Sequence, residues 1–431
     1  MNVTVVGLWH LGAVTAACLA SGGHVVIGLD FDPEVVARLQ AGIPPLFEPG
    51  LAELVQQGLA STRLRFTIDS ATALADADIV WVTYDTPVDA ADRADVAFVV
   101  ERVAQLFPHL PVGALVLISS QIPVGATRTL EQQYIAAHPN KPVTFGYSPE
   151  NLRLGKAINA FTQPDRVVVG LRAETDRARV ADLLRPFTER LEWMSVESAE
   201  MTKHALNAWL ATSVVFINEV AALCEAVGAD AKEVERGLKS EMRIGPKAYL
   251  APGAAFAGGT LARDVQFLAQ LGAAHHLPAR LWPAVQASNE AHKQWARRKL
   301  AAVFGDLRGH IVAVWGLTYK PGTDTLRRSA SVELCEWLAG QGARVQAHDP
   351  AVKTMPAELA RKIELCLTPE AALAQAEALV VATEWPDYLA CEANMIAAHM
   401  IKPLVIDANC FLAKQLSGDA RIHYTTVGRA A

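Results

Sequence analysis

A glycine-rich turn near the amino end most strongly limits what this chain can fold into. Gly7-Leu8-Trp9-His10-Leu11-Gly12 follows a short apolar run, Val3–Gly7, and leads into a helix-like run from Leu11 to Ser21. A second strand-like run, Val25–Leu29, ends at Asp30, about 20 residues after the turn, as a dinucleotide-binding unit requires. Amides at the start of such a helix bind pyrophosphate, and the acid accepts the ribose hydroxyls. The pattern predicts a dinucleotide-binding fold, and the acidic Asp30 favours NAD over NADP.

The turn departs from the usual pattern at its middle position, where Trp9 stands in place of glycine. That glycine normally lets the pyrophosphate approach the backbone closely. A bulky indole there must swing aside, so we expect weaker or reshaped cofactor binding. An ordinary tight turn in an α/β domain that holds no nucleotide is the alternative interpretation.

Short β-branched runs alternate with helical stretches at both ends of the chain. Strands are expected at Ile79–Val82, Ala114–Ile118, Val143–Tyr147, Val167–Gly170, His310–Gly316, Arg344–Asp349, Ala378–Ala382 and Leu404–Asp407. Helices are expected at Pro33–Leu39, with Asp32 as N-cap, and at Val332–Gly340. Such alternation predicts doubly wound parallel sheets, whose ligands bind at the carboxyl ends of the strands.

A long helix separates the two α/β regions. From Ser198 to Val227 apolar residues keep near-helical spacing with no glycine or proline, and further helix is expected to about Val303. We therefore predict an α/β fold in which two Rossmann-like domains, residues 1–195 and 301–431, are joined by this helix in a helical middle domain, residues 196–300. The two α/β regions could be distant structural echoes of each other.

Composition excludes several classes of protein. The chain has 431 residues, 51% hydrophobic and 19% charged, which is typical of globular domains and not of disordered or collagen-like chains. The net charge of −6 offers no basic surface for nucleic acid or an anionic membrane. The six cysteines form no C-x-x-C pair, so neither a metal site nor a disulfide framework is indicated. With no signal-like start or spanning apolar run, we expect a soluble cytoplasmic protein without a membrane or nucleic-acid partner.

Many segments, in order along nearly the whole chain, resemble the UDP-glucose/GDP-mannose dehydrogenase family. They are Pro45–Leu51, Thr83–Pro87, Ile122–Gly125, Ser148–Arg153, Gln163–Arg166, Ala199–Glu200 with Lys203, Asn207 and Asn218–Glu219, Arg243–Pro246, Tyr249–Gly253, Gly316–Pro321 with Asp324 and Arg327, and Thr383–Trp385. That family oxidises the C6 alcohol of a nucleotide sugar to the acid in two NAD-dependent steps. The resemblance implies NAD on the first domain, the substrate's nucleotide on the third, chemistry at the central helix, and a homodimer.

Lys203 and Asn207 stand one helical turn apart, so both are expected to project from one face of the long helix. An ammonium and an amide placed together can hold an oxyanion or an ordered water. The resemblance implies this role for them, a water-orienting role for Asp264, and a base in the late hydrolytic step at Glu150. A solvated helix charge and a loop cap are the plainer alternatives for Lys203 and Glu150.

The turn and the resemblance together imply two sets of binding residues. Cofactor contacts are expected at Gly7, Trp9, His10, Leu11, Gly12, Asp30, Thr86 and Gln121. Substrate contacts are expected at Arg153, Arg243, Tyr249, Gly253, Phe256, Gly258, Lys320 and Arg327.

One departure from the family concerns its nucleophile. The family has a cysteine shortly before its aspartate, whereas the segment Phe256–Asp264 has Thr260 at that position and no cysteine nearby. A thiol with a pKa near 8.5 supplies some thiolate at neutral pH, but a threonine hydroxyl ionises far less readily. Gln121 replaces a threonine, Leu154 a glutamate and Asn409 an arginine, so we expect a reworked sugar pocket.

These observations favour an NAD-dependent oxidoreductase on a nucleotide sugar that stops after one hydride transfer. Four alternatives stay open. They are full oxidation through a hydrated aldehyde, an epimerase that returns the hydride, a catalytically silent nucleotide-binding scaffold, and a simple 2-hydroxy-acid or β-hydroxy-acid dehydrogenase. The second α/β domain argues against the last of these, because small acids need no nucleotide-holding domain.

Overall fold

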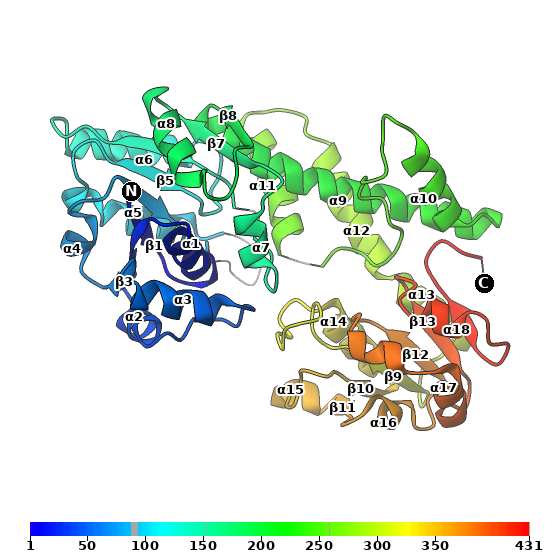
Figure 1. The fold of residues 1–431 in the computed structure, drawn as a ribbon. Helices are drawn as coiled ribbons and strands as arrows, with labels where there is room; N and C mark the ends of the chain where they lie inside the picture. The colour runs from blue at the N-terminus through cyan, green and yellow to red at the C-terminus, as the bar shows by residue number, and fades with distance from the viewer. Residues whose placement is uncertain (88–93, 151, 258, 431) are drawn as a thin grey trace. The chain divides into compact units, whose positions relative to one another are not determined.

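The computed structural model describes residues 1–87, 94–150, 152–257 and 259–430. The chain forms two compact units, Met1–Ala205 and Leu206–Ala431. The boundary falls inside the long helix α9 (Val196–Val227). Each unit contains one sheet, and each is described separately (Figure 1).

The first unit is built on an eight-stranded sheet with the order β3-β2-β1-β4-β5-β6-β7-β8. Its strands are β1 (Asn2–Val6), β2 (Val25–Leu29), β3 (Leu64–Thr67), β4 (Ile79–Val82), β5 (Leu115–Ile118), β6 (Thr144–Tyr147), β7 (Val167–Leu171) and β8 (Leu191–Met194). The first six strands have the order of a dinucleotide-binding fold. The sequence did not indicate β3 or β8, which are four residues each.

The sheet is parallel, as predicted, except at one pair of strands. β6 and β7 are antiparallel, with Tyr147 opposite Gly170 and Gly146 opposite Leu171. A parallel pair needs a crossover that returns the chain to the starting edge of the sheet. Here β7 instead starts at the edge of the sheet at which β6 ends. That edge is where ligands of such sheets bind.

Helices cover both faces of this sheet. They are α1 (His10–Ser21), α2 (Pro33–Gln40), α3 (Leu51–Ala60), α4 (Ser70–Leu74), α5 (Val96–Ala104), the 3-10 turn Phe107–His109, α6 (Ala126–Ala137), α7 (Ala157–Thr162) and α8 (Thr175–Leu184). Val3 and Val5 of β1 pack with α1, α3, α7 and α8, whereas Val6 packs with α4, α5, α6 and the start of α9. A strand buried on both faces needs such a continuous apolar run.

The second unit contains a six-stranded, wholly parallel sheet with the order β11-β10-β9-β12-β13-β14. Its strands are β9 (Ile311–Trp315), β10 (Arg344–His348), β11 (Ile363–Leu365), β12 (Ala378–Val381), β13 (Leu404–Asp407) and β14 (His423–Thr425). Its helices are α14 (Ala330–Gly340), α15 (Ala357–Ala360), α16 (Pro369–Leu373), the 3-10 turn Pro386–Ala390, α17 (Ala393–His399) and α18 (Ala413–Leu416). This order repeats that of the first six strands of the other sheet, as expected of structural echoes.

The helical middle of the chain comprises α9, α10 (Ala231–Ser240), α11 (Thr260–Ala274), α12 (Leu281–Lys293) and α13 (Trp295–Phe304). The expectation of helix continuing to about Val303 is wrong between Ser240 and Thr260. The described residues of that stretch form turns and loop, because Pro246 and Pro252 cannot donate helical hydrogen bonds and Gly245 adopts a positive φ of 84°.

α9 begins at Val196, two residues before the expected start, and ends at Val227 as expected. By length and composition alone it is apolar enough to cross a membrane, in contrast to the expectation that no segment would be. Its buried residues include the polar side chains Lys203, Asn207 and Asn218. We interpret α9 as a core helix, because core helices of soluble proteins meet the same criteria.

Candidate active site

The glycine turn after β1 is held together by Asp30 and Thr83. The Leu8 amide donates to Asp30 Oδ2 at 2.6 Å, and the Thr83 hydroxyl donates to the Gly7 carbonyl at 2.8 Å. Gly7 has a φ of 89°, and a Cβ on Gly12 would lie 1.8 Å from the Gly7 carbonyl oxygen. Both positions therefore require glycine. Asp30 Oδ1 also accepts from the Asp32 amide at 3.0 Å, which leaves the carboxylate further acceptor capacity for hydroxyls.

A pocket of about 330 Å³ lies beside this turn. It is lined by Gly7, Trp9, Asp30, Phe31, Asp32, Val35, Tyr84, Asp85, Pro87, Phe98 and Arg102. Within the described part of the chain, the buried Tyr84 hydroxyl has no hydrogen-bond partner. A buried polar atom without a partner is costly, so a ligand with a polar group would satisfy it. The turn, the acid and this pocket fit the adenosine part of NAD.

Trp9 caps the start of α1 without a side-chain hydrogen bond and is 45% exposed. Its φ of −70° and ψ of −156° are extended values that any residue adopts, so the turn is not strained by the missing glycine. The indole lines the pocket, whereas Leu11 is buried in the core against the sheet.

Two expected cofactor residues from separate loops meet in the structure. The Thr86 hydroxyl donates to the Gln121 carbonyl at 2.6 Å, and both residues are buried. Another expected cofactor residue, His10, contacts a carboxylate: its Nε2 lies 3.0 Å from Glu48 Oε2.

Lys203, which is buried, pairs with the partly buried Glu150 in the first unit. Lys203 Nζ donates to the Glu150 carbonyl at 2.5 Å and lies 3.3 Å from Glu150 Oε1. The lysine side chain is 7% exposed, so it is not a solvated helix charge. Glu150 Oε2 accepts from the Leu152 amide at 2.8 Å, so this carboxylate also caps its own loop. Arg153 lies in the same loop and is exposed.

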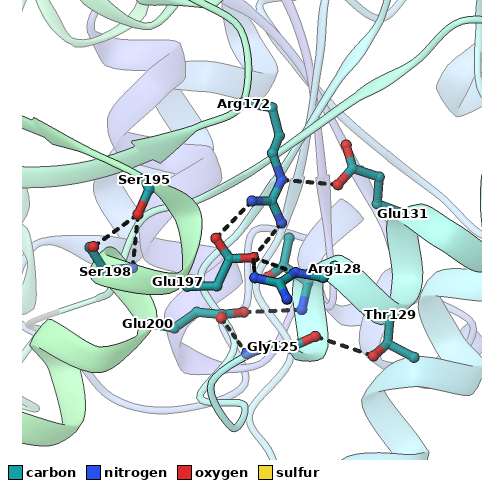
Figure 2. Close-up of polar contacts among 10 residues, drawn as sticks. Gly125, Arg128, Thr129, Glu131, Arg172, Ser195, Glu197, Ser198 and Glu200 are labelled. Atoms are coloured by element: carbon teal, nitrogen blue, oxygen red, sulfur yellow. Dashed lines mark hydrogen bonds and ion pairs between the residues drawn. The ribbon is translucent and has the colours of Figure 1, made fainter.

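Carboxylates at the start of α9 fix this helix to the first unit (Figure 2). Glu200 is fully buried and accepts from the amides of Gly125 and Thr127 at 2.6 and 3.0 Å. Those amides begin α6 directly after the Ile122–Gly125 loop. One turn earlier, Glu197 accepts a bidentate pair of hydrogen bonds from Arg172, each 2.7 Å long.

The Arg172 guanidinium is the main cause of a lowered pKa at Glu197. Its hydrogen bonds lower the pKa of Glu197 from 4.5 to about 2. Arg128 donates to the same carboxylate at 2.9 Å, and Arg172 also donates to Glu131 at 2.9 Å (Figure 2). The result is a charged network that holds the helix start against α6 and β7.

In the second unit, Asn207 Nδ2 donates to Asp264 Oδ2 at 2.5 Å, and both side chains are buried. Asp264 stands in the second turn of α11, the helix that begins at Thr260. Thr260 follows Gly259, which has a φ of 108°, and it is exposed. The structure therefore brings Asn207 and Asp264 into contact and places a threonine at the head of the helix that carries Asp264.

Side-chain amides hold the loop before α11. Asn218 Oδ1 accepts from the Gly253 amide at 3.0 Å, and Asn289 exchanges hydrogen bonds with the Phe256 amide and carbonyl at 3.0 and 2.9 Å. A Cβ on Gly253 would lie 2.2 Å from Asn409 Oδ1, which itself accepts from the Ala254 amide at 2.6 Å. The resemblance predicts an arginine at position 409. The asparagine found there instead binds the loop backbone through its side-chain oxygen.

Other expected substrate residues remain at the surface of the second unit. Arg243, Tyr249 and Arg327 are exposed, and Lys320 lies 5.5 Å from the Tyr319 ring centroid. Gly258 lies outside the described residues. A pocket of about 110 Å³ beside this region is lined in part by Ala254, His292, Lys293, Arg297 and Asn409.

Several residues that build these sites were missed by sequence reasoning. Asp349 directly follows β10 and accepts from the Leu317 and Thr318 amides at 2.7 and 3.0 Å, as Asp30 accepts from Leu8 after β1. The repeated strand–glycine–acid spacing could have revealed Asp349. No local pattern could have revealed the hydrogen-bond partners of Glu48, Asn218, Asn289 and His292, which lie more than 30 residues away in sequence.

Comparison with known proteins places this geometry in a family. Three models of the UDP-glucose/GDP-mannose dehydrogenase family match the chain: its NAD binding domain at residues 1–188, its central domain at 197–291 and its UDP binding domain at 313–414. A UDP-glucose 6-dehydrogenase of Rhizobium meliloti is 35% identical, with all of both chains covered. One of Pseudomonas aeruginosa is also 35% identical, over 100% of this chain and 98% of the relative.

Solved structures agree with the sequence comparison. A UDP-glucose dehydrogenase from Pyrobaculum islandicum superposes with a TM-score of 0.87 at 31% identity, covering 100% of this chain and 98% of that one. A UDP-D-ManNAc dehydrogenase from Pyrococcus horikoshii shares the fold with a TM-score of 0.84 at 23% identity, covering 100% and 99%. With family models matching along most of its length and relatives aligned end to end, this chain belongs to the UDP-glucose/GDP-mannose dehydrogenase family.

Proposed function

We propose that the chain is an NAD-dependent dehydrogenase that oxidises UDP-glucose, or a closely related nucleotide sugar, by a single two-electron step. The relatives named UDP-glucose 6-dehydrogenases support the substrate class. The observation that carries the single step is α11 itself. It keeps Asp264, hydrogen-bonded to Asn207, but begins at Thr260 where the family places its thiol.

The cofactor supplies a hydride acceptor when it is bound. In the first unit, the amides of the Gly7–Gly12 turn and the carboxylate of Asp30 would hold its pyrophosphate and adenosine ribose. Thr86 and Gln121 would line its path toward the loop of Glu150. An NAD-binding role for these residues agrees with the family's NAD binding domain, which matches residues 1–188.

Removing a hydride from an alcohol carbon also requires a place for the hydroxyl proton. We assign Lys203 to polarise the substrate oxygen, because a buried ammonium stabilises negative charge far better than water does. With NAD bound, the alcohol carbon would give up a hydride with its electron pair and the hydroxyl proton would pass to solvent, so that the products would be a carbonyl, NADH and a proton. In the second unit, Asn207 and Asp264 would orient a water.

A thioester cannot form without a thiol, and this is the physical basis of the single step. Thr260 is β-branched, and its hydroxyl is a far weaker nucleophile than a thiolate at neutral pH. Full oxidation to the uronic acid is the second candidate, and the Asn207–Asp264 pair favours it, because a water held there could hydrate the aldehyde. An epimerase that returns the hydride and a silent scaffold are weaker alternatives.

The proposed organisation has three domains, at residues 1–195, 196–300 and 301–431, in a cytoplasmic homodimer. Support for self-association comes from an exposed apolar stripe on the second-unit part of α9. Trp209, Phe216 and Leu223 recur every seven residues, are between 48% and 68% exposed, and are followed by exposed Val227. Exposed apolar stripes of this kind mark interfaces.

Product identification tests the proposed function. The enzyme is incubated with NAD⁺ and UDP-glucose, and with other UDP- and GDP-sugars in parallel, and hydroxylamine traps any aldehyde for mass spectrometry. A trapped carbonyl product supports the proposal, an acid supports full oxidation, and an isomer without NADH supports epimerisation. No conversion of any sugar nucleotide would overturn the enzymatic assignment. Thr260→Cys should shift the wild-type product from carbonyl to acid, with Thr260→Ser as the matched control.

A further inference from the structure

Glu48 is a buried carboxylate that joins two functional segments of the first unit. Its Oε2 lies 3.0 Å from His10 Nε2 and accepts from the Gly155 amide at 2.7 Å, while its Oε1 accepts from the Ala157 amide at 2.8 Å. The Glu48 side chain is only 1% exposed. Because a carboxylate only accepts, His10 Nε2 must carry the proton in this contact.

One donor lies in the turn proposed to bind the cofactor, and the other two lie at the end of the loop that contains Glu150 and Arg153. His10 is the first residue of α1, within the glycine turn that is proposed to hold the cofactor pyrophosphate. Gly155 and Ala157 end the loop that contains Glu150 and Arg153. Lys203 holds the same loop at Glu150. The loop is thus fastened at one end to the catalytic lysine and at the other to Glu48.

Burial makes these contacts interdependent. A buried carboxylate is tolerated only when hydrogen bonds replace its lost hydration. Glu48 accepts one hydrogen bond from the turn and two from the loop. Weakening the hydrogen bond to one segment therefore changes how strongly the carboxylate binds the other segment. An anion bound at the turn would act on the same imidazole that Glu48 holds. This ring is the shared element through which either ligand can influence the other.

We infer that Glu48, through His10, is a positioning residue that couples cofactor binding to the placement of the Glu150–Ala157 loop. The consequence is that cofactor and nucleotide sugar do not bind independently: each changes the dissociation constant of the other by the same factor. This inference rests on the proposed function, because it requires both ligands to bind.

Calorimetric titration of NADH measures the coupling without turnover, because NADH and UDP-glucose cannot react with each other. The quantity is the ratio of the NADH dissociation constants without and with saturating UDP-glucose. We expect a ratio of about fivefold or more in the wild-type chain. Glu48→Gln and His10→Phe should bring it to within about twofold of one. His10→Gln, which can still donate to Glu48, should restore most of it, and Glu53→Gln, at an exposed position of α3, is the matched control.

Each outcome bears on a different claim. An unchanged ratio in His10→Phe, with both ligands bound, would overturn the inference and leave the proposed function standing. A wild-type ratio of one would likewise overturn the inference and leave the proposed function standing. If Glu48→Gln fails to fold, His10→Phe still decides, because it leaves both loop contacts of Glu48 in place. No binding of NADH or UDP-glucose to the wild-type chain would overturn the proposed function and the inference together.

Discussion

Asn207 and Asp264 form a hydrogen-bonded pair in the second unit, with the Asn207 amide donating to the Asp264 carboxylate at 2.5 Å. Asp264 has no exposed surface, and Asn207 is 6% exposed. A charge-assisted hydrogen bond at such a position is among the stronger ones in proteins. The pair therefore has consequences for folding as well as for catalysis.

Asn207→Ala should lower the free energy of unfolding by about 1–3 kcal/mol, because it removes a donor from a buried carboxylate. Urea unfolding followed by circular dichroism measures the change. Asn140→Ala, at an exposed loop position, is the control and should shift the midpoint very little. An Asn207→Ala variant as stable as the wild type would mean that Asp264 is satisfied without this amide.

Lys203→Met should lower kcat by about a hundredfold or more, because one donor to a developing oxyanion has an effect of that size. Methionine keeps the length of the side chain, so the dissociation constant for NADH should stay within about twofold of the wild-type value. Initial rates and calorimetry separate the two effects. Lys232→Met, at the exposed start of α10, should leave kcat unchanged. A full rate in Lys203→Met would remove Lys203 from the chemistry.

Trp9→Gly should tighten NADH binding by about three- to tenfold, because the pyrophosphate can then approach the turn backbone. The extended backbone at Trp9 suits glycine without rearrangement, and glycine is tolerated at a helix N-cap. Fluorescence titration of NADH measures the affinity, with Trp9→Ala as an intermediate case. Weaker binding in both variants would show instead that the indole contacts the cofactor.

Acid stability should depend on Glu197. Its pKa is lowered to about 2, chiefly by hydrogen bonds from Arg172, so the folded state binds a proton less readily than the unfolded chain. The stabilisation is therefore complete above about pH 5 and is lost as the pH falls toward 2. Glu197→Gln should flatten the fall in unfolding free energy over that window, measured by urea unfolding at several pH values. An unchanged slope, equal to that of Glu53→Gln, would contradict the assignment.

The sequence predicted the elements whose signal is local. β2, β4 and β13 match the expected bounds, and Asp32 caps α2 by accepting from the Glu34 amide at 2.9 Å. Apolar runs bounded by turns, and a cap residue before proline, depend on neighbouring residues alone. The direction of β7 could not be predicted, because it depends on how residues 148–166 cross the edge of the sheet.

The sequence predicted which residues form the candidate site but not which residues they contact. Lys203, Asn207, Asp264 and Glu150 could be named from spacing and resemblance. Their contacts span 53 and 57 residues, and no local pattern determines such pairings. Glu48 shows the same limit more strongly, since its donors lie 38, 107 and 109 residues away. Glu48 joins these segments only in the folded chain, where it is buried and its three donors lie close to it.

The central claim is that Thr260 limits the enzyme to one hydride transfer, and counting NADH tests it most directly. The wild-type enzyme is given limiting UDP-glucose with excess NAD⁺, and the NADH formed at completion is divided by the sugar nucleotide consumed. We expect a ratio of one in the wild-type enzyme, rising toward two in Thr260→Cys. A wild-type ratio of two, with uronic acid as the product, would contradict it and show that water replaces the thiol.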